Sequence, residues 1–344
     1  MYQKDFYGMS NINDYLNLSK LGEGTFGTVT KCKQKKTGKL VALKKLIVHK
    51  KDDGFPLTSL REITILKKLK HKNIIHENNN ENSNNSIPGV FYMVTPYMSS
   101  DLTGLLQNPR ITLNENVKKC FMIQLLEGLN YLHHQKLYHR DIKAANLLID
   151  YNNVLKIADF GLARHYKGDL PRDNHASTTT CKYTSLVVTR WYRAPELLFF
   201  DSLYTTAIDC WGVGCVFGEL YYKKPILQGA SDMDQGIKIF ELMGFSNDNK
   251  KLLDYYSKLP NPNKIILTTY QSNLNDFFKP FALSKNAIDL LSKLLDLNPK
   301  TRYNCEAALN HPYFKEYPLP SKPYDFKSFE ESHEMDIKRY NEEK

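Results

Sequence analysis

HRDIKAANLLIDYNNVLKIADFG, residues 139–161, is the stretch of sequence that decides the fold. Two short apolar runs, 147–149 and 154–157, flank a turn-forming Asp-Tyr-Asn-Asn sequence. Apolar runs around such a turn predict a hairpin. The hairpin would double the chain back and return Asp159 to the side of Asn146.

The polar residues of this segment point to phosphoryl transfer. Asn146 and Asp159 would offer hard oxygen ligands, which suit Mg²⁺ held together with triphosphate oxygens. Asp141 is left free of the metal to accept the proton of a substrate hydroxyl, and Lys143 can reach the transferring phosphoryl group. The segment therefore predicts ATP and Mg²⁺ as cofactors, with Asp141 as the base.

A glycine-rich run, GEGTFGTV at residues 22–29, has the composition of a phosphate-binding loop. Missing side chains let backbone N–H groups approach phosphates closely. Incidental glycines between two strands would give a similar pattern, and so would a dinucleotide-binding loop. The dinucleotide alternative fails because a β-branched, strand-like run rather than a helix follows Gly27.

A lysine and a glutamate complete the predicted nucleotide site. Ala42 and Lys44 lie on one face of an apolar strand candidate. If Val29 and Ala42 line an adenine slot, Lys44 would reach the α and β phosphates. Glu62, on a predicted helix, is the carboxylate expected to hold Lys44 in an ion pair.

Hydrophobic periodicity divides the chain into a β-rich part and a helical part. Strand candidates in the first part lie at residues 16–18, 27–32, 40–43 and 90–94. One helix begins near Pro56 and places Glu62, Leu66 and Leu69 on one face. Helical periods follow Leu102, at residues 117–132, 207–221 and 287–295. The pattern predicts an α+β fold with a small β-rich N-lobe, one regulatory helix and a larger helical C-lobe.

Composition excludes several classes of protein. The chain has 344 residues, enough for two lobes that share a cleft, and its six cysteines lack the spacing of a zinc site or disulfide framework. No apolar stretch of about 18 residues occurs, which predicts no membrane span. The net charge of +10 favours an acidic partner or substrate, but the lysines lack interleaved aromatics, so direct nucleic-acid binding is not expected.

Two polar segments are predicted to lie outside the packed core. Residues 78–86 form an Asn-rich insert that is expected to be a mobile loop. The tail from about Lys315 is rich in Pro, Lys and Glu and is expected to lie on the surface or to be partly disordered.

From about residue 15 to 314 the chain resembles a eukaryotic protein kinase. Ala-Pro-Glu ending at Glu196 would close the activation segment that opens at Asp159. The resemblance implies serine/threonine specificity from Lys143, a brace for the catalytic loop from Asp209, and a pair between Arg302 and Glu196.

The resemblance also implies domain boundaries and a set of nucleotide-contacting residues. The boundaries are an N-terminal extension 1–14, an N-lobe 15–96, a hinge 97–101, a C-lobe 102–314 and a tail 315–344. The nucleotide-contacting residues are Leu21, Gly22, Glu23, Gly24, Thr25, Phe26, Gly27, Thr28, Val29, Ala42, Lys44, Pro96, Met98, Asp101 and Leu148.

The helix sequence PLTSLRE at residues 56–62 resembles that of cyclin-dependent kinases, whose helix is pushed into place by a cyclin. Mitogen-activated kinases share part of it, but their Thr-x-Tyr activation motif is missing here. The resemblance implies a single activating phosphate on Thr184, added by another kinase. Arg61, Arg140 and Arg164 would supply guanidinium groups around that phosphate.

Within that family, Lys-Ala-Ala-Asn at residues 143–146 and the tail at 332–340 look like the fungal bypass-UAS kinases, which are related to the kinase of positive transcription elongation factor b. This likeness implies a nuclear complex with a cyclin. It also implies RNA polymerase II C-terminal repeats and elongation factors as substrates, phosphorylated at Ser or Thr before Pro.

Two departures from the family pattern carry expectations. Phe26 stands where cell-cycle relatives have an inhibitory tyrosine, so tyrosine-based inhibition is not expected there, and Thr25 remains a candidate site. Thr95 stands where these kinases usually have phenylalanine, which predicts a roomier rear pocket.

Two other functional interpretations remain open. One is a pseudokinase scaffold, which is disfavoured because Lys44, Asp141, Asn146 and Asp159 are all present. The other is a cyclin-independent, proline-directed kinase of the mitogen-activated type, which differs only in how it is controlled.

Overall fold

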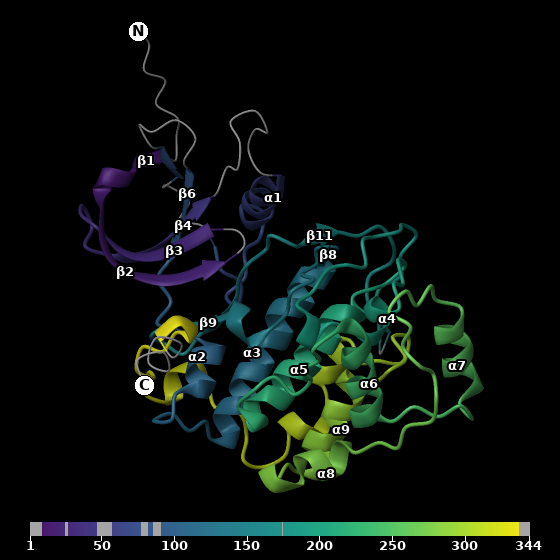
Figure 1. Ribbon diagram of the computed structural model, residues 1–344. Coiled ribbons are helices and arrows are strands. Elements are labelled where there is room, and N and C mark those ends of the chain that lie inside the picture. The colour runs from purple at the N-terminus through teal and green to yellow at the C-terminus, as the bar shows by residue number, and fades with distance from the viewer. Residues whose placement is uncertain are drawn as a thin grey trace.

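A computed structural model describes residues 9–24, 27–46, 57–76, 82–84, 91–173 and 175–336. A small lobe, built from a twisted sheet and helix α1 (Leu57–Leu66), sits on a larger and mainly helical lobe (Figure 1). This arrangement is the predicted α+β, two-lobed architecture.

The N-lobe is built on one sheet with the strand order β1-β5-β6-β4-β3-β2. Its pairings are antiparallel except for β1 with β5. A small core of side chains from the sheet, Tyr15, Cys32, Val41, Leu43 and Val94, packs inside this lobe. The strands are β1 (Met9–Asn11), β2 (Tyr15–Gly24), β3 (Gly27–Gln34), β4 (Leu40–Leu46), β5 (Asn82–Asn84) and β6 (Phe91–Pro96).

Two expectations for the N-lobe are corrected. Helix α1 ends at Leu66, one turn before the predicted Leu69, which is nevertheless buried in the main core. Residues 82–84 of the Asn-rich insert form strand β5 instead of a loop, because strand pairing uses backbone groups and requires no apolar side chain. The rest of that insert and the predicted helix start at Pro56 lie outside the described residues.

The C-lobe packs around two long helices, α3 and α5. Almost every residue of α5 is buried, including Trp211, as expected for a helix that is apolar on all sides. Side-chain caps fix the starts of α6 and α9, where Ser231 and Ser284 accept hydrogen bonds from backbone N–H groups. The helices are α2 (Leu102–Gln107), α3 (Glu115–His134), α4 (Pro195–Leu198), α5 (Ala207–Tyr222), α6 (Asp232–Met243), α7 (Lys250–Ser257), α8 (Leu274–Phe278), α9 (Lys285–Leu294) and α10 (Cys305–Leu309).

Short strands at the lobe boundary carry the decisive segment. The predicted hairpin is present as β9 (Leu147–Ile149) paired antiparallel with β10 (Leu155–Ile157). Strand β7 (Ser100–Asp101) joins the same sheet, and β8 (Leu137–Tyr138) pairs with β11 (Arg164–His165). These strands hold the catalytic loop between the two lobes.

The tail is more closely packed than expected. Buried Lys119 on α3 donates to the carbonyl oxygens of Glu316 and Pro318, each at 2.9 Å. Further along, Ser332 and His333 are only 1% and 7% exposed against the hinge region. The described tail is therefore an ordered part of the C-lobe surface.

The described residues contain no membrane-spanning helix and no disulfide bond. In the described ranges, no helix combines the length and apolar character that a bilayer crossing would require. All six cysteines fall in those ranges and are free thiols.

Candidate active site

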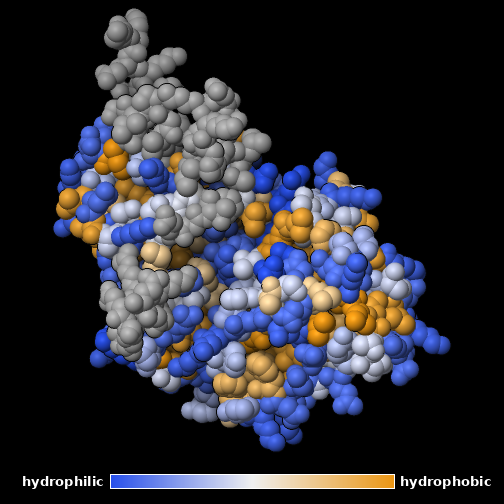
Figure 2. All heavy atoms as spheres, viewed as in Figure 1, coloured by the Kyte–Doolittle hydropathy of each residue, from blue (hydrophilic) through white to orange (hydrophobic). Residues whose placement is uncertain are grey.

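A cavity of about 590 Å³ lies between the two lobes. The space-filling view shows this hollow below the N-lobe, with hydrophobic surface in its depth (Figure 2). The predicted residues that line it are Leu21, Gly22, Gly27, Val29, Ala42, Lys44, Glu62, Pro96, Met98, Asp101, Asp141, Lys143, Asn146, Leu148 and Asp159.

Five of the residues predicted to contact the nucleotide are not among the residues that line the cavity. Thr28 lies in β3 but is not among the lining residues, and Glu23 and Gly24 are described only as the end of strand β2. Thr25 and Phe26 lie outside the described residues. Gly24 and Gly27, on either side of these two residues, pair in the antiparallel β2–β3 ladder.

The start of β3 at Gly27 requires a glycine. Its φ is +138°, and a Cβ at this position would lie 1.8 Å from the carbonyl oxygen of Lys45. Only glycine fits so close to the backbone of β4, and Gly27 also lines the cavity.

The predicted lysine–glutamate ion pair is present at the back of the cavity. Lys44 Nζ lies 2.9 Å from both carboxylate oxygens of Glu62 and 3.5 Å from Asp159 Oδ1. Burial opposes the charge on Lys44, but the two carboxylates outweigh it and raise the pKa of the lysine. Lys44 therefore stays cationic at a place where phosphate oxygens would bind.

Asp141 is held by four neighbouring groups. Its Oδ2 accepts a hydrogen bond from Asn146 at 2.9 Å and lies 2.8 Å from Lys143 Nζ, while Oδ1 accepts from the Thr189 hydroxyl at 2.9 Å and the Thr189 N–H at 3.2 Å. Burial alone would raise the pKa of Asp141, but the Lys143 ammonium and the hydrogen bonds lower it below its usual value. The group is an oriented carboxylate, ready to accept a hydrogen bond from a substrate hydroxyl.

Asn146 and Asp159 fit the ligands of a divalent cation. The amide NH₂ of Asn146 donates to Asp141, at 2.8 Å to the main-chain oxygen and 2.9 Å to the carboxylate, which leaves its side-chain oxygen as the ligand atom. Within the described part of the chain, the buried Oδ1 of Asp159 accepts no hydrogen bond. Lys44 Nζ lies 3.5 Å from this oxygen, and the carboxylate keeps further lone pairs that a divalent cation could bind.

Backbone contacts bring these two ligands together. The Ala158 N–H donates to the Asn146 carbonyl at 2.9 Å, so Asp159 follows directly beside Asn146, as the hairpin predicted. Buried His139 also connects the two parts of the site. Its Nε2 donates to Ala158 O at 3.1 Å, and its Nδ1 accepts from Asp141 N–H at 3.2 Å. Burial lowers the pKa of His139, which keeps the ring neutral and able to play both roles.

Asp209 braces the catalytic loop, as the resemblance implied. Its two carboxylate oxygens accept from the N–H groups of His139 at 2.9 Å and Arg140 at 2.8 Å. Arg140 has φ +66° and Asp159 has φ +63°, a left-handed conformation that is uncommon outside glycine. Such conformations cluster at functional sites, and here the buried carboxylate holds the first of them in place.

The activation segment is anchored by a fully buried ion pair. Arg302 donates to Glu196 through Nη1 at 2.7 Å and Nη2 at 2.9 Å, with side-chain exposures of 0% and 1%. This is the pair that the resemblance implied.

Arg61, Arg140 and Arg164 lie close to one another, and Arg140 is connected to Thr184 through Tyr204. Partial burial and repulsion from Arg164 and Arg140 lower the pKa of Arg61, so these positive charges lie close together. Arg140 Nη1 donates to the Tyr204 hydroxyl at 2.9 Å, and that hydroxyl donates to the Thr184 carbonyl at 3.0 Å. The exposed Thr184 is thus tied to the arginine cluster through one hydroxyl group.

Thr95 lines the cavity directly opposite Ala42 on the neighbouring strand. We expect a roomy rear pocket because threonine fills far less volume than phenylalanine. Thr95→Phe should weaken binding of bulky adenine-site inhibitors about ten-fold or more, measured by competition against ATP, and should leave small inhibitors unaffected. Unchanged affinity for the bulky compounds would contradict the expectation.

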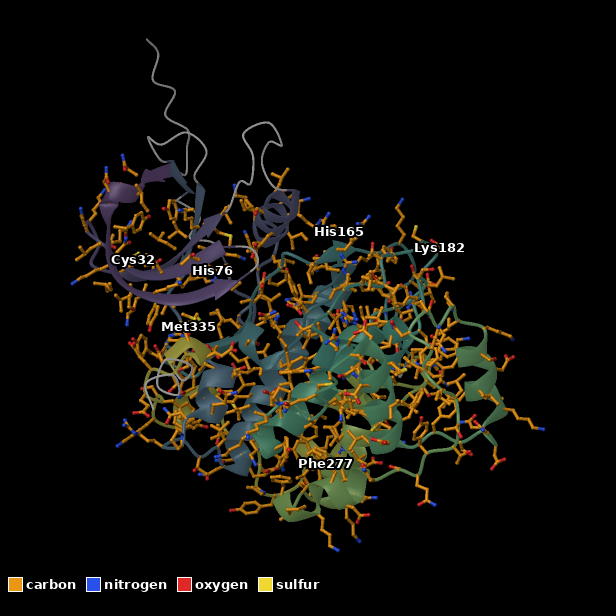
Figure 3. All side chains as sticks on the ribbon, in the orientation of Figure 1. Cys32, His76, His165, Lys182, Phe277 and Met335 are labelled. Atoms are coloured by element: carbon orange, nitrogen blue, oxygen red, sulfur yellow. The ribbon has the colours of Figure 1, made fainter. Side chains whose placement is uncertain are left out.

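Among the cavity-lining residues that sequence reasoning missed, three belong to the tail. His333, Glu334 and Met335 of the tail reach the mouth of the cavity. Met335 lies below the N-lobe sheet and beside α2 in the side-chain view (Figure 3). The only signal was the likeness of the 332–340 sequence to relatives, which gave no role to these residues.

Comparison with known proteins identifies the class. A protein kinase domain model matches residues 15–314, so the chain belongs to the protein kinase family. Membership in this family implies use of ATP and a divalent metal ion.

Curated relatives make the class more specific. The chain is 48% identical over 349 residues to a serine/threonine-protein kinase of the BUR type from Gibberella zeae, covering 99% of this chain and 64% of the relative. It is 50% identical over 342 residues to the kinase of the same name in Saccharomyces cerevisiae, covering 96% of this chain and 51% of that relative. The chain therefore spans about half to two thirds of the length of these relatives.

A solved structure also resembles this chain and supports the same class. The chain aligns with a TM-score of 0.77 and 36% identity to a chain of "the yeast RNA Pol II CTD kinase CTDK-1 complex", covering 94% of this chain and 98% of that one. The predicted resemblance to transcriptional cyclin-dependent kinases of the fungal BUR type is confirmed. So are the kinase fold and an ATP-dependent serine/threonine kinase domain.

Proposed function

We propose that the protein is the catalytic subunit of a cyclin-bound nuclear kinase that transfers the γ-phosphate of Mg²⁺-ATP to Ser or Thr followed by Pro. Its proposed substrates are RNA polymerase II C-terminal repeats and elongation factors, and its proposed role is to promote transcription elongation. The observation that carries the catalytic part is the oriented Asp141 carboxylate, which is held by Lys143, Asn146 and Thr189.

Phosphoryl transfer mainly requires that the reacting groups be positioned and that the charge on the phosphates be neutralised. Asp141 orients the substrate hydroxyl and accepts its proton as the new O–P bond forms and the bond from the γ-phosphorus to the bridging oxygen of ADP, the leaving group, breaks. Lys143 lies 2.8 Å from Asp141, and its ammonium group can contact the transferring phosphoryl group. Lys44 binds phosphate oxygens, and Asn146 with Asp159 would hold Mg²⁺, which neutralises the charge on the phosphates.

Specificity for proline is supported by the geometry of Val188. This residue has φ +69°, and its carbonyl accepts from Arg193 through Nη2 at 3.1 Å and Nε at 3.3 Å. Arg193 also donates to Val187 O at 3.0 Å. Because the Val188 carbonyl already accepts two N–H groups, a substrate N–H at this place would find that acceptor occupied. Proline has no N–H and loses nothing.

This reasoning predicts strong discrimination between Ser-Pro and Ser-Ala peptides. An unpaired N–H costs about 1–3 kcal/mol, so kcat/KM should fall about 10- to 100-fold when Ala replaces Pro. The measurement is steady-state phosphorylation of matched repeat peptides by the complex. Comparable rates on the two peptides would contradict the assignment.

A cyclin partner is supported by α1 and the arginine cluster. Glu62 on one side of α1 is buried in the site, whereas Leu60 on the same helix is 50% exposed. A partner that covers Leu60 would also fix Glu62 and Arg61, and so couple binding to catalysis. The solved relative is itself described as a complex.

Phosphorylation of Thr184 is the second proposed control. A phosphate with a charge of about −2 would relieve the repulsion among Arg61, Arg140 and Arg164 and tie α1 to the catalytic loop. We expect Thr184→Ala to lower kcat of the cyclin complex about 10- to 100-fold, with Thr180→Ala as the control. Full activity of Thr184→Ala would show that phosphorylation of Thr184 does not regulate the kinase, and this part of the proposal would be withdrawn.

Substrate identity rests on the relatives. The solved neighbour is named a kinase of the RNA polymerase II C-terminal domain. The alternative, a cyclin-independent kinase of the mitogen-activated type, has less support because Thr-Ser-Leu at residues 184–186 lacks the Thr-x-Tyr pattern. A complex recovered from native extract should contain a cyclin and should phosphorylate Ser-Pro repeat peptides, and failure on both counts would overturn the proposal.

A further inference from the structure

One segment of the tail is fixed against the C-lobe beside the nucleotide cavity. Asp101 N–H donates to Ser332 O at 3.2 Å, and Glu334 N–H donates to the Asp101 carboxylate at 2.8 Å. Asn108 Nδ2 lies 2.8 Å from Ser332 Oγ. Packing is so close that a Cβ on Gly104 would lie 2.3 Å from Ser332 O. The backbone of this segment is therefore held in one position.

That position projects the Glu331 side chain toward both lobes. Its carboxylate lies 2.8 Å from Lys31 Nζ on β3 of the N-lobe and accepts from the Tyr97 hydroxyl of the hinge at 2.9 Å. It also accepts a hydrogen bond from the hydroxyl of Tyr151, in the β9–β10 turn of the C-lobe. One carboxylate thus contacts the N-lobe, the hinge and the C-lobe.

The contact is shielded on the lysine side, whereas the Glu331 side chain is 43% exposed. The Lys31 side chain is only 15% exposed, and its Nζ lies 4.2 Å above the centre of the Tyr97 ring, a cation–π geometry. Partial burial opposes ionisation of Glu331, but the bonds from Lys31, Tyr151 and Tyr97 lower its pKa. Burial and the Glu331 bond raise the pKa of Tyr151 to about 12, so its hydroxyl keeps the proton that it donates.

Lys31 is directly connected to the nucleotide cavity. It pairs in register with Ala42 and lies two residues from Val29, on the same face of β3. Val29 and Ala42 both line the cavity. An interaction that fixes Lys31 relative to the C-lobe therefore determines the distance between β3 and the bound nucleotide.

We propose that Glu331 is a positioning residue that holds β3 closed over the nucleotide by joining Lys31 to the hinge and the C-lobe. The inference rests on the proposed kinase function and extends it to the tail. The tail segment 330–336 is then part of the kinase machinery, although Glu331 itself need not touch ATP. Loss of this link opens the cavity and weakens ATP binding without removing any group that takes part in phosphoryl transfer.

Charge exchange in the active cyclin complex tests the link. Glu331→Lys and Lys31→Glu should each raise KM for ATP about five-fold, since the lost interaction is a partly shielded ion pair, and should change kcat less than about two-fold. The double variant restores opposite charges and should return KM to within about two-fold of the wild type. Glu330→Gln is the matched control, because the contacts of Glu330 within the described chain are with Ser100, Asn108 and Arg110, on the hinge and C-lobe side of the cavity.

The outcomes separate this proposal from others. An unchanged KM in Glu331→Lys, or a double variant no better than the single variants, would overturn it. An equal rise in KM for Glu330→Gln would show a general loss of tail packing and would also overturn it. An inactive wild-type complex would instead count against the proposed function, so the two failures can be told apart.

Discussion

Asp141→Asn should lower kcat by about 1,000-fold, because the substrate hydroxyl loses the group that orients it and takes its proton. KM for ATP should change less than about three-fold, since the nucleotide is held by Lys44 and the glycine loop rather than by Asp141. The measurement is steady-state kinetics of the cyclin complex with a Ser-Pro peptide.

The control for this variant is Asp248→Asn, which changes an exposed aspartate far from the cavity. It should leave kcat unchanged. If Asp141→Asn kept more than about a tenth of wild-type kcat, Asp141 would not be the base, and a scaffold role for the chain would gain weight.

Arg302→Met should lower the free energy of unfolding by about 3–5 kcal/mol. The substitution leaves Glu196 buried without its partner, and an uncompensated buried charge is strongly destabilising. Chemical denaturation of the purified chain measures the effect. Replacing both residues, as in Arg302→Met with Glu196→Leu, should recover most of the loss because no charge then remains buried.

An exposed pair provides the contrast. Lys258 lies 2.6 Å from Asp254, but the two side chains are 71% and 61% exposed. Lys258→Ala should therefore cost less than about 1 kcal/mol. If Arg302→Met cost no more than this control, the buried pair would not be what anchors the activation segment.

The sequence predicted best where chemistry and local pattern coincide. The β9–β10 hairpin follows from two apolar runs around a turn, and it places Asp159 after the Asn146–Ala158 contact as expected. The Lys44–Glu62 pair was predicted from a strand face and a helix face. These predictions succeeded because each depends on a short stretch of chain or on a charge that needs a partner.

Other features came only from resemblance or were missed. The brace from Asp209 joins residues about 70 positions apart, and no local periodicity indicates it. Strand β5 exists because an open sheet edge accepts any backbone, even an Asn-rich one. The helix α1 ends before Leu69, although Leu69 keeps its predicted place in the core.

The tail shows most clearly what sequence composition does not predict. Its Pro-, Lys- and Glu-rich composition predicts a surface extension, yet Ser332 and His333 are buried and Glu331 reaches across the lobe boundary. These contacts depend on the surface presented by Ser100 and Asp101 of the hinge and by Gly104 of α2, which is set by tertiary packing. Composition alone carries no information about such a long-range fit.

The most direct test of cyclin-dependent catalysis is the activity of the purified chain, phosphorylated at Thr184, with and without a cyclin subunit. On Ser-Pro repeat peptides we predict strong activity only in the phosphorylated complex, and at least about ten-fold less from the phosphorylated chain alone. Strong activity of the phosphorylated chain without any cyclin would contradict cyclin dependence.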